Sequence, residues 1–248
     1  MKPVISFANH KGGVGKTTSA VNIASVFGEM GKRVLVIDLD PQGSAGLHFG
    51  VRDTGEKLLR AMEKTIALPV LPTVASGVDL VPSGLALSAA AQRFSGVLGA
   101  ELLGRCLMRT QGDWDLVIID CPPGSGILTM SALLVSQHVL IPIEANHLAV
   151  NGLHQLIEIL DSMDREGRTP AILGIIACRA NPRRRSHKEI MTRLEKSFPG
   201  KIAPFIRENV AVAEAPAHGQ PMTLYAPDSN GAKDYRQAAE WLLQRLPG

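Results

Sequence analysis

The segment at residues 11–18 is the part of the chain whose residue types and spacing point most directly to chemistry. It consists, in order, of Lys11, Gly12, Gly13, Val14, Gly15, Lys16, Thr17 and Thr18. A glycine-rich turn between a strand and a helix points several backbone N–H groups, and the positive end of the helix dipole, at one place. Such a loop cradles phosphate, with Lys16 placed to reach the β- and γ-phosphates of a nucleotide and the Thr17 hydroxyl placed to bind Mg²⁺.

Two later apolar runs end in aspartate and supply acidic partners for this loop. The run at residues 34–39 leads to Asp38 and Asp40, which alternation along a strand places on the same side, and the run at residues 116–119 leads to Asp120. An aspartate at such a strand end typically holds Mg²⁺ directly or through water. A lone aspartate there is more often a turn or cap residue, but three features in order on three strands indicate nucleotide binding.

A parallel sheet is needed to bring these residues together, and the sequence predicts one. Apolar strands are expected at residues 4–8, 34–39, 78–81, 116–119, 139–143, 173–178 and 201–205. Helices are expected at residues 17–30, 89–109, 131–136, 150–165, 187–198 and 234–246. Continuous apolar strands that alternate with helices are typical of an α/β fold with a parallel sheet covered on both faces, and ligand then lies at the carboxyl ends of the strands.

Composition adds broad limits to this interpretation. The chain has 248 residues, 45% apolar and 20% charged, which is ordinary for one globular domain, and we expect a single domain over residues 1–248 with a surface loop at residues 68–76. A net charge of +3 is too small to indicate nucleic-acid binding by itself. The three cysteines show neither paired nor zinc-ligand spacing, which fits a reducing cytoplasm, and no apolar run is long enough to suggest a membrane span.

These motifs resemble those of the deviant-Walker ATPases of the ParA/MinD group, a P-loop NTPase family, and most closely the Soj-like ParA partition ATPases. The resemblance covers nearly the whole chain. Its segments are Lys11–Thr18, Asp38–Gly43, Asp120–Pro123, Ile141–Glu144, Val150–Leu153 and Asn209–Pro216. The Asp-Leu-Asp-Pro-Gln-Gly run favours ParA over MinD. The first strand begins by Val4, so a helix-turn-helix extension that would bind an operator is not expected.

The resemblance implies a role for each residue of the loop and its acidic partners. Lys16 would bind the phosphates of ATP within its own subunit, while Lys11 would cross to the ATP of a partner subunit, so that ATP supports a sandwich homodimer. Thr17 would coordinate Mg²⁺, with Asp120 and Asp38 in support. Asp40 would orient or activate the attacking water. Lys11 would add positive charge where negative charge develops on the transferring phosphoryl group, as an arginine finger does.

The resemblance also places the adenine contacts and the DNA contacts in the C-terminal half. The expected adenine contacts are Phe205, Ile206, Arg207 and Asn209. Non-specific DNA contacts are expected from Arg183, Arg184, Arg185 and Lys188, the densest basic cluster of the chain. Clustered arginines suit phosphate binding, although a solvated loop and helix start would have the same composition. Soj-like proteins usually carry two further arginines where this chain has Glu208 and Ala211, so more of the DNA contact must fall to the cluster.

The expected function is therefore that of a cytoplasmic, nucleoid-associated ATPase that uses ATP and Mg²⁺. ATP would drive dimerisation and DNA binding, and a ParB-like or cargo-adaptor partner would stimulate weak intrinsic hydrolysis. The cargo stays open among plasmid, chromosome and protein body. A MinD-like membrane ATPase is the alternative, disfavoured because the closing helix at residues 234–246 lacks a basic face. An iron–sulfur carrier like nitrogenase reductase is a third, disfavoured because no second cysteine matches Cys121.

Overall fold

A single twisted sheet organises the chain, and most of its strands are parallel. The structure is a computed structural model that describes residues 2–144, 149–164, 167 and 169–246. Within these residues the strands follow the order β3-β4-β2-β5-β1-β6-β7. Their bounds are β1 Val4–Phe7, β2 Val34–Asp38, β3 Leu71–Pro72, β4 Val78–Val81, β5 Leu116–Asp120, β6 His138–Glu144 and β7 Ala171–Cys178. Only β3 runs antiparallel to its neighbour among these strands, so the α/β expectation is confirmed.

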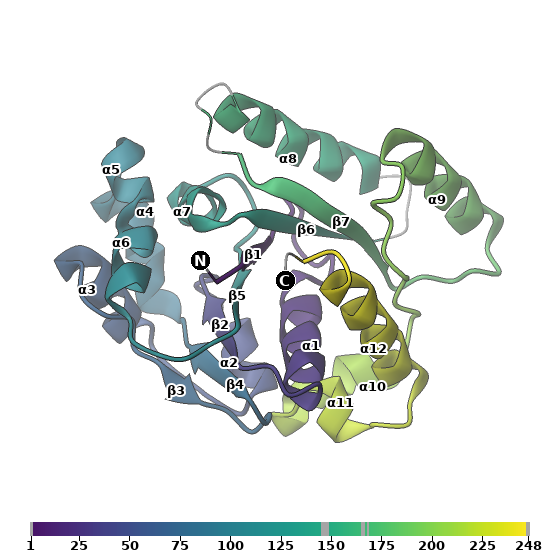
Figure 1. The fold of residues 1–248 in the computed structure, drawn as a ribbon, viewed down its shortest axis with the longest axis horizontal. Coiled ribbons are helices and arrows are strands. Elements are labelled where there is room, and N and C mark those ends of the chain that lie inside the picture. Colours follow the sequence, from purple (N-terminus) through teal and green to yellow (C-terminus); the bar gives the residue numbers. More distant parts are fainter. Residues whose placement is uncertain (1, 145–148, 165–166, 168, 247–248) are drawn as a thin grey trace.

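Helices cover both faces of the sheet, as Figure 1 shows. The longer ones are α1 Lys16–Glu29, α3 Glu56–Lys64, α6 Leu102–Arg109, α7 Ile127–Val135, α8 Ala149–Asp164, α9 Arg185–Ser197 and α12 Asn230–Leu243. The shorter ones are α2 Ser44–His48, α4 Ala90–Arg93, α5 Gly96–Ala100, α10 Val210–Glu214 and α11 Met222–Tyr225, with 3₁₀ turns at Leu85–Ala89 and Ala215–His218. One hydrophobic core lies under α1 and α12, and the other lies under α3 and α6 to α9.

Helix α1 is buried on nearly all sides, although its sequence predicts one apolar face. It packs between the sheet, α11 and α12, so its polar residues are also buried. Two of these polar residues have hydrogen-bond partners in α11. The Asn22 side chain accepts a hydrogen bond from the backbone N–H of Met222 at 2.6 Å, and the Ser25 and Thr223 hydroxyls lie 2.7 Å apart. Gly31, with φ +81°, follows the helix end in the left-handed conformation that favours glycine. This burial fixes the helix whose first turn carries the phosphate loop.

Four sequence predictions about elements are wrong in detail. Residues 201–205 form no strand, because this segment makes only an isolated bridge from Ile202 to Ile175 of β7. The expected helix at 89–109 is divided into α4, α5 and α6, with an extended Phe94 between the first two. The loop at 68–76 contains β3, and the last helix begins at Asn230, where Ser229 caps it. The earlier start of the last helix follows from this local cap, which the sequence prediction overlooked.

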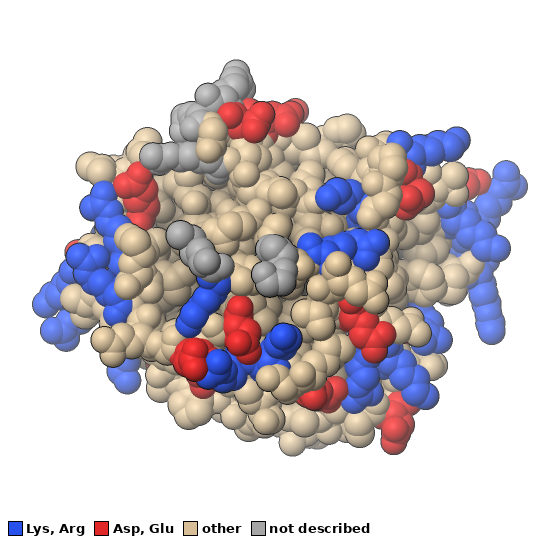
Figure 2. All heavy atoms as spheres, viewed as in Figure 1, with Lys and Arg blue, Asp and Glu red and all other residues tan. Residues whose placement is uncertain are grey.

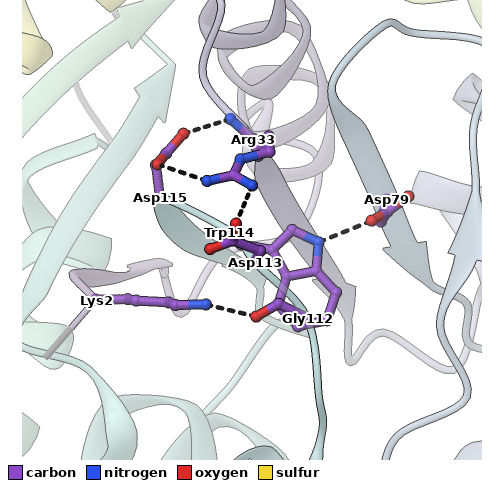
Figure 3. Close-up of polar contacts among 7 residues, drawn as sticks. All are labelled: Lys2, Arg33, Asp79, Gly112, Asp113, Trp114 and Asp115. Atoms are coloured by element: carbon purple, nitrogen blue, oxygen red, sulfur yellow. Dashed lines mark hydrogen bonds and ion pairs between the residues drawn. The ribbon is translucent and has the colours of Figure 1, made fainter.

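Hydrogen bonds and ion pairs connect the amino ends of β2 and β5, at the edge of the sheet opposite to the edge that carries the phosphate loop. The Arg33 backbone N–H donates to the Asp115 carboxylate at 2.7 Å, and its guanidinium pairs with Asp113 and Asp115 (Figure 3). Trp114 donates from Nε1 to Asp79 of β4 at 2.8 Å. These contacts join the starts of β2, β4 and β5, whose pairing brings their carboxyl ends to the edge of the sheet where the acidic residues lie.

Candidate functional site

The loop between β1 and α1 has the backbone that a phosphate cradle requires. Gly13 and Gly15 have φ of +73° and +92°, in the left-handed region that favours glycine, and α1 begins directly after Gly15. A Cβ atom at Gly15 would lie 3.0 Å from the Sγ atom of Cys178, so the loop also packs too closely on β7 for a larger residue. The N–H groups of the first turn of α1 therefore face the space in front of the loop.

The two lysines of the loop lie in different surroundings. Lys16 is 6% exposed, and its ammonium donates to the Lys11 carbonyl at 3.0 Å. Burial lowers the pKa of Lys16, against the opposing effect of the nearby Asp120 carboxylate. The Lys11 side chain is 38% exposed at the mouth of the loop, with its ammonium 4.0 Å from the Glu144 carboxylate. Lys16 is thus held inside the site, whereas Lys11 has room to leave it.

Asp120 presents a carboxylate without a hydrogen-bond partner in the described structure. Its side chain is fully buried, and neither oxygen makes a bond of good geometry. Burial raises its pKa to about 7, although the neighbouring Thr17 hydroxyl and the Lys16 charge act in the opposite direction. A buried acid that lacks a partner and lies beside the first turn of α1 fits a role in holding a hydrated cation.

Asp38 and Asp40, which the sequence places on the same side of a strand, differ in burial and in hydrogen bonding. Asp38 is buried, and its two oxygens accept the backbone N–H groups of Asp40 and Ala45 at 2.9 and 3.0 Å. Burial, with the Asp120 charge in addition, raises the pKa of Asp38 well above its usual range. Asp40 is half-buried, and within the described part of the chain its side chain accepts one hydrogen bond, from the Gln42 N–H at 3.0 Å. Asp38 therefore builds the loop after β2, while Asp40 keeps one oxygen available to a ligand.

The segment after Asp120 is connected directly to the phosphate loop. The Gly124 N–H donates to the His10 carbonyl at 2.9 Å, and Pro123 packs beside Gly12. The Cys121 thiol is fully buried, and burial raises its pKa, as expected for a structural thiol. A ligand that moves the loop would therefore also move the segment that follows β5.

A cavity of about 390 Å³ opens beside the loop and extends toward the C-terminal half. Its walls come from Gly15 and Thr18, from the end of β7, from Tyr235 and from residues 206–210, 212 and 213. Three of the four residues expected to contact adenine line it, namely Ile206, Arg207 and Asn209. Phe205 does not, because its ring packs against His187 at 5.7 Å on the side of the other core.

Arg207 is held in place by an ion pair that sequence reasoning missed. Its guanidinium and its backbone N–H donate to the buried Asp234 carboxylate of α12, at 2.6 to 3.1 Å. Asn209 is also engaged, because its side chain caps α10 by accepting the Ala211 N–H at 2.9 Å. The side chain of Glu208, which sequence reasoning treated only as a departure from the family, lies on the same cavity wall. No local pattern links residues 207 and 234.

The predicted basic cluster lies at the start of α9, away from the phosphate loop. Arg183, Arg184, Arg185 and Lys188 are all exposed. Arg185 pairs with Glu189 one turn on, at 2.9 Å. Figure 2 shows blue side chains projecting from the α9 end of the molecule, at the right. The structure thus separates a nucleotide-sized cavity from a basic surface.

The described residues include neither a ready-made cluster of metal ligands nor a helix that could span a membrane. In this part of the chain no group of three or more histidine, cysteine, aspartate or glutamate side chains is arranged to hold a metal ion. Magnesium usually keeps several waters and binds through one or two protein ligands and substrate phosphates, which fits Thr17 and Asp120. Of the helices described, none has the length and apolar character needed to cross a bilayer.

The fold and the loop define a P-loop nucleotide-binding protein, and comparisons with known proteins identify its family. A family model described as an AAA domain matches residues 2–172. The chromosome-partitioning ATPase Soj of Thermus thermophilus is 36% identical over 98% of this chain and 96% of its own length. The chain belongs to the Soj/ParA family of partition ATPases, as its motifs predict.

Two solved structures support the same assignment. The McdA protein of Cyanothece, as a variant in complex with ATP, superposes with a TM-score of 0.85 at 25% identity and covers 100% of this chain and 98% of its own. A Mycobacterium smegmatis protein described as cobyrinic acid a,c-diamide synthase, with an ATP analogue and magnesium, gives a TM-score of 0.82 at 27% identity, with 98% and 95% covered. The family and the fold are therefore established from both sequence and structure.

Replacing Asp120 with asparagine tests the burial of its carboxyl group. A pKa of about 7 in the folded chain, against about 4 when unfolded, means that the folded state binds more protons between these values. The free energy of unfolding then falls as the pH rises from about 4 to about 7. Without nucleotide at pH 8, we expect Asp120→Asn to be more stable than wild type by about 1–4 kcal/mol.

Urea unfolding at pH 5 and pH 8, in the presence of EDTA, measures this difference. The gain should be clearly larger at pH 8 than at pH 5, because at pH 5 only the first part of the range between the two pKa values has been crossed. Equal destabilisation at both pH values would show that the carboxyl group is not buried as described.

Proposed function

We propose that this chain is a partition ATPase that forms a homodimer with ATP, binds DNA without sequence preference, and leaves DNA after hydrolysis. The observation that carries the proposal is the contrast between the two lysines of one loop. Lys16 is enclosed beside the cradle, and Lys11 is held half-exposed at its mouth. One lysine is enough to bind phosphate within a subunit, so the second is available to a nucleotide in another subunit.

ATP and Mg²⁺ are the proposed ligands of the loop. Support comes from the glycine cradle, from the adjoining cavity and from the ATP and magnesium complexes of the related structures. Mg²⁺, when bound, neutralises the charge of the β- and γ-phosphates. Thr17 and Asp120 would hold its hydration sphere, and Lys16 would exchange its bond with the Lys11 carbonyl for one with phosphate. Ile206, Arg207 and Asn209 would form the wall of the cavity that contacts the adenine base, with Arg207 and Asn209 held in place by their own hydrogen bonds.

Hydrolysis needs a residue that orients water, and Asp40 is the one whose position suits it. It lies beside Lys16 and Asp120, because its charge influences the pKa of both. It is half-buried, and within the described residues its carboxylate accepts one backbone N–H, whereas the buried Asp38 carboxylate accepts two. A carboxylate here would accept a proton from water as it attacks the γ-phosphate. Lys11 of the partner subunit would stabilise the charge that develops on the transferring group.

DNA and a stimulating partner complete the proposed cycle. The exposed arginines at the start of α9 supply contacts for phosphates. A dimer presents two such clusters, which would make DNA binding depend on ATP. A ParB-like or cargo-adaptor protein would accelerate hydrolysis and so release the dimer from the nucleoid. A MinD-like function receives no comparable support, since the apolar residues of α12 are buried in the core.

Lys11→Ala tests the action of Lys11 across the dimer. We expect it to abolish dimerisation with ATP and to leave nucleotide binding nearly unchanged, because Lys16 and the backbone cradle remain. Stimulated hydrolysis should fall by about 10³-fold or more, the effect that follows loss of an arginine finger. Light scattering and fluorescent-nucleotide titration measure the two properties, and a normal ATP dimer would refute the role.

Asp40→Ala tests the orientation of water. We expect ATP turnover to fall by about 10²–10⁴-fold, the usual contribution of a general base, while ATP and Mg²⁺ still bind. The ATP dimer should then persist on size-exclusion chromatography, whereas the wild-type dimer decays. Turnover at the wild-type rate would exclude Asp40 from catalysis.

Substitution of Arg183, Arg184 and Arg185 by glutamate tests the DNA surface. We expect DNA retention to be lost at moderate salt and the salt dependence of binding to weaken by about one unit of slope for each contact removed. A matched control replaces Lys57, Arg60 and Lys64 of α3, which are also exposed, by glutamate. If both triple variants lose DNA equally, net charge and not the α9 cluster controls binding.

A further inference from the structure

The carboxyl end of β6 contacts the start of the phosphate loop through Asn9. Asn9 is buried, its Nδ2 atom donates to the Pro142 carbonyl at 2.7 Å, and its Oδ1 atom accepts the Lys11 N–H at 3.0 Å. One side chain thus connects the backbone of Lys11 to β6. This link restrains the backbone of Lys11, whereas its side chain is half-exposed.

The same strand also holds the end of that side chain. Glu144 is the last residue of β6 and lies two residues beyond Pro142, and its Oε2 atom is 4.0 Å from the Lys11 ammonium. β6 lies directly beside β1 in the sheet, so this carboxylate is placed at the mouth of the loop. Burial, with a smaller effect of the Glu144 charge, raises the pKa of Cys178 to about 11, so Glu144 also lies near the cavity side of the loop.

We propose that Glu144 is a positioning residue that holds Lys11 on its own subunit until a second, ATP-bound subunit arrives. The inference rests on the proposed function, because it requires Lys11 to act across a dimer. Glu144 and the partner's ATP would compete for the same ammonium group. The strand that fixes Lys11 through Asn9 would therefore also set how readily Lys11 is released.

The ion pair between Lys11 and Glu144 is weak, so it would adjust the dimer dissociation constant and would not prevent dimerisation. Both side chains are more than one-third exposed, and ion pairs of this kind change an equilibrium by about fivefold at most. A symmetric dimer uses two Lys11 side chains, so the dimer dissociation constant would change by up to about 30-fold. A triphosphate carries more charge than one carboxylate, which lets the ATP of a partner prevail once the subunits meet.

The first experiment measures the contact itself, in the nucleotide-free chain. Lys11 is labelled with an amine-reactive ester, and its modification rate is followed by mass spectrometry of peptides. Glu144→Gln should raise this rate about two- to fivefold, because the amide keeps the shape and removes the charge. In Glu144→Asp, which keeps the charge, the rate of Lys11 modification should stay closer to that of wild type. The matched control is Glu63→Gln, which breaks a surface ion pair with Arg93 elsewhere in the chain.

The second experiment measures dimerisation by analytical ultracentrifugation with adenylyl imidodiphosphate and Mg²⁺. Glu144→Gln should form the dimer at a protein concentration between about 2- and 30-fold lower than wild type, and Glu63→Gln should not. Added salt should reduce the difference in dimer dissociation constant between Glu144→Gln and wild type, because salt screens the Lys11–Glu144 ion pair in the wild type.

The outcomes separate this inference from the proposed function. An unchanged rate of Lys11 labelling in Glu144→Gln overturns the inference, whatever the dimer does. Faster labelling with unchanged or weaker dimerisation overturns it as well, because Glu144 would then not compete with the dimer. If no variant dimerises, and wild type behaves like Lys11→Ala, the proposed function fails, and with it the positioning role, even though the labelling result stands.

Discussion

The pairing of β1 between β5 and β6 is the constraint on which the rest of the site depends. Phe7, the last residue of β1, is in register with Asp120 of β5 on one side and with Leu140 of β6 on the other. Asp120 is in turn in register with Asp38 of β2. Because parallel strands end at one edge of a sheet, this register alone delivers the loop and both acids to the same place.

That arrangement places like charges close together before any ligand is present. Asp38 and Asp120 are both fully buried, burial and mutual repulsion raise the pKa of Asp38, and burial lowers that of Lys16. A site of this kind is costly in the free chain, and a ligand that brings balancing charge repays part of the cost. Binding of a nucleotide with its cation would therefore stabilise the folded state, in proportion to the logarithm of ligand concentration.

The parts of the site that lie close together in sequence could be predicted, and the parts built by packing could not. The loop at residues 11–18 and the acids that end β2 and β5 follow from local pattern, because apolar runs and glycines mark the strand ends. The Arg207–Asp234 ion pair, the turn of Phe205 away from the cavity and the division of residues 89–109 into three helices depend on neighbours far along the chain. Likewise, the sequence predicts Asp38 as a supporting acid at the metal side, and what it could not predict is that both oxygens also accept backbone N–H groups of the next loop.

The two lysines are coupled through the backbone of the loop. Lys16 donates to the carbonyl of Lys11, and Asn9 binds the N–H of the same residue. The peptide groups on both sides of Lys11 are therefore held, one by the cradle and one by β6. When phosphate draws Lys16 away from that carbonyl, the backbone of Lys11 loses one restraint and keeps the other. In the proposed dimer, occupation of one cradle would thus alter how Lys11 is presented to a second subunit, and the nucleotide state of each subunit would then influence assembly.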